Sequence, residues 1–172
     1  KVIFILGTGH CGSTLLDLIL GSHSNTFSLG EIHTVLKKDM NEPLCNLCDE
    51  ECEIWTTELR RKLKQCYNPS LLQRITSKIF LEKGIETSFY KEIYKKVNQS
   101  ILIDSSKNAG WIYRNGKQLH KSKIFEPILL YLSRDGRAVV NSYYRKYPDK
   151  GIENIAHNWN NRIEKINKCF SD

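Results

Sequence analysis

A glycine-rich turn, GTGHCGST, occupies residues 7–14 and limits the chain to few architectures. An apolar run at residues 2–6 precedes the turn and predicts a buried strand, and a helical apolar pattern begins at Leu15. A turn between a strand and a helix directs backbone N–H groups and the helix N-terminus at one point, where they bind an anion. The sequence therefore predicts a phosphate-binding loop near the N-terminus.

The loop lacks the lysine that nucleoside-triphosphate enzymes use. The spacing of Gly7 and Gly12 matches the pattern G-x-x-x-x-G-K-[ST], but Ser13 stands at the lysine position and Thr14 follows it. The loop thus keeps the shape that holds a phosphate and lacks the charge that ATP-dependent enzymes place on the β- and γ-phosphates. This contrast argues against a triphosphate ligand.

Short apolar strands alternate with helical patterns along the chain. Strands are expected at residues 2–6, 100–104 and 127–132, and residues 22–28 are predicted to be a polar turn. Helices are expected at residues 12–20, 29–37, 55–63, 71–81, 89–97, 138–147 and 155–166. This alternation is typical of an α/β fold with a central parallel sheet covered on both faces.

All three expected strands end in polar residues that can carry chemistry. GTGHCGST follows the first strand, DSSK the second and SRDGR the third. Ligands of open parallel sheets bind beyond the carboxyl ends of the strands. These three segments are therefore expected to form one site.

Length and charge set wide limits on the function. A chain of 172 residues suffices for one domain with a hydrophobic core. The formal net charge of +7 suits an anionic ligand, an acidic substrate or nucleic acid, and is also typical of a solvated basic surface. The sequence contains no apolar run of about 18 residues that would predict a membrane span, and no signal peptide is recognisable.

The segment LYLSRDGRAVVNSYYR, at residues 130–145, contains a second candidate anion site. Arg134 follows the third strand, and Ser142 lies eight residues later in a predicted helix. A guanidinium fork suits phosphate oxygens, and a serine hydroxyl can add a contact. Alone, the pattern is better explained by an Arg134–Asp135 pair and a small helix residue. Combined with the lysine-less loop, it favours phosphate binding by Arg134 and Ser142.

These motifs resemble those of the sulfotransferases that use 3′-phosphoadenosine 5′-phosphosulfate (PAPS). GTGHCGSTLLDLILGSHS resembles their 5′-phosphosulfate loop, and SRDGRAVVNSYYR resembles their 3′-phosphate motif. ILIDSSK resembles a strand-end segment of the bacterial and carbohydrate- or tyrosine-type branch. The similarity touches residues 2–33, 101–108 and 128–147. It implies a three-layer P-loop-NTPase-like α/β fold and transfer of a sulfuryl group.

The resemblance also implies how the co-substrate is bound. The 5′-phosphate is expected on the loop and the 3′-phosphate on the Arg–Ser pair. The residues expected to bind PAPS are Gly9, His10, Cys11, Gly12, Ser13, Thr14, Arg134 and Ser142. PAPS carries no triphosphate, so no metal is required for the transfer, and adenosine 3′,5′-bisphosphate is the product.

The loop departs from the family pattern at two neighbouring positions. Family loops commonly carry Arg or Lys where this chain has His10, followed by Ser where it has Cys11. A protonated His10 is one candidate for the missing cation. Lys107 is the other, because its position matches a lysine that approaches the transferred group in the family. A solvated lysine at a helix start is the alternative interpretation of Lys107.

The acceptor must lose a proton as it attacks sulfur, so a general base is expected. Glu31 is the first candidate, because SLGEIH resembles the family segment in which a Gly-Glu pair follows the first helix. His33 is the second candidate and Asp104 the third. Glu31 and His33 are equally explained as polar surface residues of a short helix.

Cys45, Cys48 and Cys52 form a C-x₂-C-x₃-C cluster, with Cys66 further along the chain. Such thiolates can bind zinc, with Cys66 or His33 completing the four ligands. A disulfide and free thiols are the alternatives. Bacterial sulfotransferases often carry a cysteine-bearing insert ahead of a Trp, as in ECEIW. The resemblance therefore implies a helical insert at about residues 40–98 within a single domain, residues 1–172.

Three other functions stay open. A P-loop nucleotide kinase or NTPase would use ILID as a strand with a Mg²⁺-binding Asp, although the missing lysine argues against it. A non-catalytic basic domain that binds zinc or nucleic acid would explain the charge and the cysteines, but no stretch resembles a recognition module. A degenerate family member would bind PAPS without turnover.

The acceptor and the cellular location are only weakly indicated. A carbohydrate or small-molecule alcohol is favoured as the acceptor, with a protein tyrosine or an amine as further candidates. The chain opens inside a strand without Met and stops inside a helical pattern, as a fragment lacking C-terminal elements would. A bacterial cytoplasm is favoured, and a Golgi lumen or another compartment stays open because an N-terminal piece can be missing.

Overall fold

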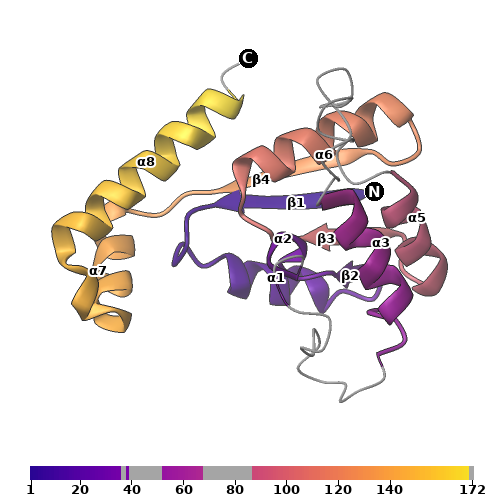
Figure 1. Cartoon of the computed structure of the whole chain (residues 1–172), viewed down its shortest axis with the longest axis horizontal. Coiled ribbons are helices and arrows are strands. Elements are labelled where there is room, and N and C mark those ends of the chain that lie inside the picture. Colours follow the sequence, from indigo (N-terminus) through magenta and orange to yellow (C-terminus); the bar gives the residue numbers. More distant parts are fainter. Residues whose placement is uncertain (36–37, 39–51, 68–86, 171–172) are drawn as a thin grey trace.

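A four-stranded parallel sheet forms the centre of the molecule (Figure 1). The computed structural model describes residues 1–35, 38, 52–67 and 87–170, and the side chains of all of these except 63–67 and 87–88. The strands, in the spatial order β2-β3-β1-β4, are β2 (Thr26–Ser28), β3 (Ile101–Asp104), β1 (Val2–Gly7) and β4 (Pro127–Leu132). The predicted α/β class with a central parallel sheet is confirmed.

Helices lie on both sides of this sheet. They are α1 (Ser13–Gly21), α2 (Ile32–Val35), α3 (Thr57–Tyr67), α5 (Thr87–Lys96), α6 (Ala109–Ser122), α7 (Gly136–Lys146) and α8 (Ile152–Phe170), with a 3₁₀ turn, η1 (Pro148–Lys150). Among the described residues, no helix has the length and apolar content that crossing a lipid bilayer requires.

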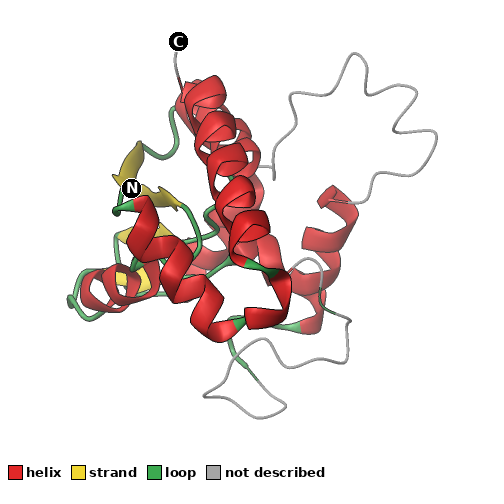
Figure 2. Ribbon diagram, turned by 90° about the vertical axis from the view of Figure 1, so that its left-hand side faces the viewer, coloured by secondary structure: helices red, strands yellow, loops and turns green. Residues whose placement is uncertain are grey.

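The two crossover helices cover opposite faces of the sheet. Helix α1 links β1 to β2 and helix α6 links β3 to β4, so the two connections run in opposite directions across the sheet. Right-handed crossovers that run in opposite directions place their helices on opposite faces, and Figure 1 shows α6 above the strands and α1 below them. Helices α7 and α8 pack together at one end, and this end faces the viewer in Figure 2.

The hydrophobic core lies between the sheet and α6. Alternate β1 residues, Val2, Phe4 and Leu6, point to this side, where they meet the buried Trp111 and Ile112 of α6. The ring of Tyr90, on α5, completes the layer with an edge contact to Phe4. Helices α3 and α5, which fall in the predicted helical insert, join this core through Leu59 and Phe89, and the ring of Trp55, just before α3, stacks on Phe89.

The opposite face of the sheet is held by hydrogen bonds as well as by packing. Asp17 points inward from α1 and accepts hydrogen bonds from the Ser28 hydroxyl (2.7 Å) and from the Ser105 hydroxyl (2.9 Å). These two serines lie at the ends of β2 and β3, so one buried carboxylate fixes α1 across both strands.

Two elements differ from the sequence-based expectation. Residues 22–28 do not form a turn throughout, because Thr26–Ser28 pair with β3 as an edge strand. A three-residue strand with one large apolar side chain, Phe27, carries no readable alternation. Helix α6 was not predicted at all, since Gly110 and Gly116 interrupt its apolar pattern. The helix predicted at residues 71–81 lies outside the described residues.

The end of β3 is organised around the buried carboxylate of Asp104, which has no exposed surface. Oδ1 accepts from the backbone N–H of Ser106 (2.9 Å) and from the Ser106 hydroxyl. Oδ2 accepts from the Tyr90 hydroxyl (3.1 Å) and the Trp111 indole N–H (3.0 Å). Burial raises the pKa of the Asp104 carboxyl, and these hydrogen bonds act in the opposite direction. The carboxylate thereby ties together β3, α5 and α6.

Replacing this carboxylate by an amide is expected to destabilise the fold. In Asp104→Asn, the amide nitrogen replaces Oδ1 or Oδ2, and each of these faces a donor that cannot reverse its role, the Ser106 backbone N–H or the Trp111 indole N–H. We expect the free energy of unfolding to fall by about 1–3 kcal/mol in urea denaturation followed by circular dichroism.

A double-mutant cycle tests whether the indole N–H is the donor left unsatisfied. Trp111→Phe removes the indole N–H. The double variant is therefore expected to lose less free energy of unfolding than the sum of the losses in the two single variants. Additive effects would contradict the assignment of the indole N–H as the partner that Asp104→Asn leaves unsatisfied.

Candidate functional site

The carboxyl ends of three strands meet at one edge of the sheet. Strand β1 pairs in parallel with β3 on one side and with β4 on the other, and Gly7 lies opposite Leu132 at the end of β4. A Cβ atom at Gly7 would lie 2.8 Å from the Leu132 carbonyl oxygen and 2.9 Å from Cys11 Sγ. Glycine is therefore needed where the loop leaves β1 beside β4.

The loop after β1 turns sharply and delivers the N-terminus of α1 to this edge. His10 (φ 62°) and Gly12 (φ 101°) both adopt left-handed backbone conformations. Gly12 is the N-cap of α1 and makes no side-chain cap hydrogen bond, and the first turn of α1 contains no acidic residue. The N–H groups of a first helical turn lack partners within the helix and attract anions.

The predicted loop residues contribute in different ways. The side chains of Cys11 and Ser13 are buried, so these residues can contact a ligand only through their backbone. Thr14 is exposed and offers its hydroxyl. Gly9 and His10 are partly exposed at the start of the turn.

Arg134 and Ser142 lie against the loop. Arg134 Nη1 donates a hydrogen bond to the His10 carbonyl oxygen (2.9 Å), and Ser142 Oγ lies 3.1 Å from His10 Nδ1. The Tyr143 ring packs beside the imidazole with 4.7 Å between ring centres. Asp135, the alternative partner considered for Arg134, instead binds the guanidinium of Arg137 (2.7 Å). The loop and the Arg134–Ser142 segment, which the sequence suggested as two anion sites, thus lie side by side.

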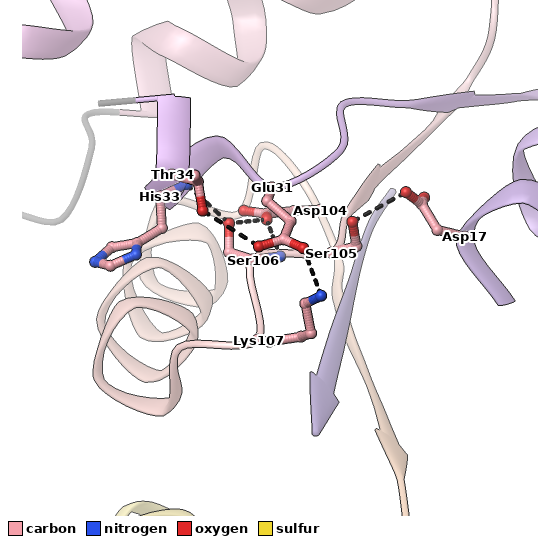
Figure 3. A network of polar contacts seen from close by, with 8 residues as sticks. All are labelled: Asp17, Glu31, His33, Thr34, Asp104, Ser105, Ser106 and Lys107. Atoms are coloured by element: carbon pink, nitrogen blue, oxygen red, sulfur yellow. Dashed lines mark hydrogen bonds and ion pairs between the residues drawn. The ribbon is translucent and has the colours of Figure 1, made fainter. Parts of the chain in front are cut away.

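Lys107 and Glu31 meet beyond the end of β3. Lys107 Nζ forms an ion pair with Glu31 Oε1, while Thr34 Oγ1 donates a hydrogen bond to Glu31 Oε2 (3.2 Å) (Figure 3). The Lys107 side chain is 16% exposed and the Glu31 side chain 41%, so the pair lies at the surface of the site. Lys107 holds a left-handed φ of 56°, which directs the chain into α6.

The two other candidate bases are less available. The His33 ring packs edge-on against Trp111, and its Nε2 lies 3.4 Å from Asn108 Nδ2. Figure 3 shows this ring pointing away from the Glu31–Lys107 pair. Asp104 is fully buried, so its carboxylate cannot reach an acceptor. Glu31 is therefore the base candidate that an acceptor could contact.

Positive charge converges on His10 from several elements. The pKa of His10 is lowered below its usual range, first by desolvation and then by four cations, which are Lys146, Lys107, Arg134 and Arg162. A lowered pKa disfavours the protonated form of His10, which is one candidate for the cation of the loop. The surrounding lysines and arginines are the other source of positive charge at this place.

Sequence reasoning missed the contribution of α8. Trp159 and Arg162 lie three residues apart on one helix face, and only the tertiary fold brings them to the loop. A Cβ atom at Gly136 would lie 2.6 Å from the Trp159 ring, so this glycine admits the ring against the start of α7. In the sequence, the spacing of Trp159 and Arg162 indicates only that the two side chains share a helix face.

The structure leaves the cysteine hypothesis largely untested. Cys52 is a free thiol that accepts a hydrogen bond from the Trp55 backbone N–H (3.4 Å). Cys45, Cys48 and the side chain of Cys66 lie outside the described residues. Within the described part of the chain, no group of three or more side chains could hold a metal ion.

Known proteins give no independent indication of function. Comparisons with family models, with curated proteins and with solved structures find no match. The function therefore has to be inferred from the chemistry of the site. That chemistry combines an uncapped helix N-terminus, converging cations and an accessible carboxylate, which suits a polyanionic ligand.

The pKa of His10 can test this electrostatic arrangement directly. Lys107→Met removes one of the cations that disfavour the imidazolium, so the His10 pKa is expected to rise in an NMR pH titration. Lys117→Met, which removes a charge from the exposed surface of α6, is the control and should leave the titration unchanged. An unchanged His10 pKa in Lys107→Met would show that the strand ends are not electrostatically coupled.

Proposed function

We propose that this protein is a sulfotransferase that binds PAPS and moves its sulfuryl group to a hydroxyl group of an acceptor. The supporting observation is the hydrogen bond between Arg134 and the His10 carbonyl oxygen, because it joins an arginine-based anion site to a phosphate loop without the usual lysine. The loop after β1 and the strand order β2-β3-β1-β4 also support a three-layer P-loop-like fold. The resemblance of the motifs to sulfotransferases agrees with this proposal.

The two ends of the nucleotide would bind to different strand ends. Backbone N–H groups of residues 9–14 would hold the 5′-phosphate at the start of α1. The Arg134 guanidinium and the Ser142 hydroxyl would hold the 3′-phosphate. The sulfuryl group would then lie toward Lys107, whose ammonium would exchange its Glu31 partner for a sulfuryl oxygen.

Glu31 would then act as the general base. The acceptor oxygen attacks sulfur as its proton passes to the Glu31 carboxylate, and a new O–S bond forms. The bond between sulfur and the bridging oxygen breaks, and its electron pair stays on the 5′-phosphate of adenosine 3′,5′-bisphosphate. Lys107 and the helix N-terminus stabilise the charge that develops on the oxygens.

A nucleotide kinase or NTPase fits the site less well. Such an enzyme would need an accessible Asp after β3 to hold Mg²⁺, but Asp104 is buried and already accepts hydrogen bonds from three residues, Tyr90, Ser106 and Trp111. Ser13, at the usual lysine position, is also buried. Both features favour a ligand that needs neither a metal nor a lysine in the loop.

Calorimetry with adenosine 3′,5′-bisphosphate tests the nucleotide site. The wild-type protein is expected to bind it in the presence of EDTA, and Arg134→Ala is expected to weaken binding about 10–100-fold through loss of a charge-assisted hydrogen bond. Arg137→Ala is the matched control, because Arg137 is 94% exposed and pairs with Asp135. Equal affinity in both variants, or tighter binding of Mg²⁺-ATP by the wild type, would refute the proposal.

Radiolabelled PAPS and a panel of phenols and sugars test the base. Glu31→Gln keeps the size of the side chain and removes the base, so the transfer rate is expected to fall about 10²–10⁴-fold. Affinity for adenosine 3′,5′-bisphosphate should be retained. The matched His33→Asn variant should keep most of the activity. Loss of activity in His33→Asn and not in Glu31→Gln would contradict this prediction and identify His33 as the base.

A further inference from the structure

A cavity of about 130 Å³ opens beside the first residues of the loop. Its walls come from Gly9, from the Tyr143 ring of α7 and from the Trp159 ring of α8, with Val139 and Ile155 adding apolar surface. An apolar and aromatic lining of this kind fits the flat or hydrocarbon body of a small molecule.

Trp159, one of the residues that line the cavity, carries a buried donor, its indole N–H, that lacks a hydrogen-bond acceptor among the described residues. Buried polar groups are nearly always paired, because an unsatisfied donor loses its hydrogen bond to water and gains nothing in return. The unpaired N–H therefore points to an acceptor atom that a ligand would bring.

Two cations flank the same cavity. Lys150 Nζ lies 3.5 Å from the Tyr143 hydroxyl and 5.4 Å from the centre of its ring. Arg162 Nη1 lies 3.4 Å from the Cβ position of Gly9, and the charge of Arg162 also lowers the pKa of His10. No carboxylate occurs among the described residues that line the cavity. The cavity therefore suits a ligand with an anionic group that accepts hydrogen bonds.

The cavity lies where an attacking group would be needed. It borders Thr8 and Gly9, at the beginning of the segment 9–14 that is proposed to hold the 5′-phosphate, and α1 begins at Ser13, toward the other end of that segment. In-line transfer requires the acceptor and the leaving phosphate to lie on opposite sides of the sulfur. A pocket at the start of the loop, beside His10, meets this requirement better than one at the helix N-terminus.

We propose that this cavity is the acceptor site and that the acceptor is a hydroxyl compound bearing an anionic group. The anionic group would bind Lys150 and Arg162 and accept the hydrogen bond of the Trp159 indole N–H. The hydroxyl group would extend past His10 toward the sulfuryl group at Lys107, where Glu31 would take its proton. The assignment as acceptor rests on the proposed sulfotransferase function, whereas the preference for an anion rests on the cavity itself.

The test compares two matched phenols, 4-hydroxybenzoate and its neutral amide, 4-hydroxybenzamide. NMR titrations of the protein saturated with adenosine 3′,5′-bisphosphate would follow the Trp159 indole N–H resonance. We expect 4-hydroxybenzoate to bind at least about tenfold more tightly than the amide, which corresponds to about 1.4 kcal/mol. The Trp159 resonance should shift during the titration. Equal affinities, or an unmoved Trp159 resonance, would overturn the proposal.

Substitutions in the cavity test whether its residues cause the preference for 4-hydroxybenzoate over the amide. Lys150→Met with Arg162→Gln should abolish the preference for the anion, and Trp159→Phe, which keeps a smaller aromatic ring and removes the donor, should weaken binding of 4-hydroxybenzoate severalfold. Lys165→Met, on the exposed surface of α8, is the control and should behave as the wild type. A preference that survives in the double variant would overturn the proposal.

Nucleotide binding separates this inference from the proposed function. Lys150→Met and Trp159→Phe, which leave the cations around His10 in place, should keep the wild-type affinity for adenosine 3′,5′-bisphosphate in calorimetry. If the nucleotide and 4-hydroxybenzoate compete, the cavity belongs to the nucleotide site, and the acceptor assignment fails while the sulfotransferase proposal stands. If the wild-type protein binds no nucleotide, the sulfotransferase proposal itself fails, and with it the acceptor assignment.

Discussion

The carboxylate of Asp104 holds the β3 side of the site in place. It fixes the turn through Ser106, and the Ser106 hydroxyl in turn accepts the backbone N–H of His33 at the start of α2. Glu31, just before α2, and Lys107, just after this turn, consequently face each other. A residue at the end of a parallel strand is often taken for a catalytic group, but here the buried acid is what positions the groups that reach the surface.

The β4 side of the site depends on a different contact. The Arg134 guanidinium binds a backbone carbonyl of the loop, so the conformation of the loop and the position of the arginine are coupled. Since β1 lies between β3 and β4, the loop that follows it is the part of the molecule that both sides can reach. Cations gathered from both sides and from α8 then make the space around His10 suited to an anion.

The sequence predicted the parts of the fold whose signals are local. The strands at 2–6, 100–104 and 127–132 are short apolar runs, and burial in a parallel sheet requires such runs. Strand β2 was not predicted because its pairing depends on β3, which is far away in sequence. Helix α6 was not predicted because its glycines weaken the helical pattern, although tertiary packing stabilises the helix.

The candidate site was predictable to a similar extent. Arg134, Ser142 and the loop could be grouped from the parallel-sheet rule and the motif resemblance, because each follows the end of an apolar strand. The lowered pKa of His10 could not be predicted, since it arises from desolvation and from charges on four separate segments. The contribution of Arg162 has the same origin, because only the packing of α8 brings it near Gly9.

His10 and Lys107 both hold a left-handed backbone conformation that side chains other than glycine rarely adopt. Such a conformation costs roughly 1–3 kcal/mol per residue and persists where the surrounding contacts impose it. Glycine at either position would relieve that cost and delete a group at the centre of the site. Selection of variants for thermal stability alone would therefore favour glycine at these two positions and remove the His10 and Lys107 side chains from the site. Stability and the proposed function thus favour different residues at the same positions.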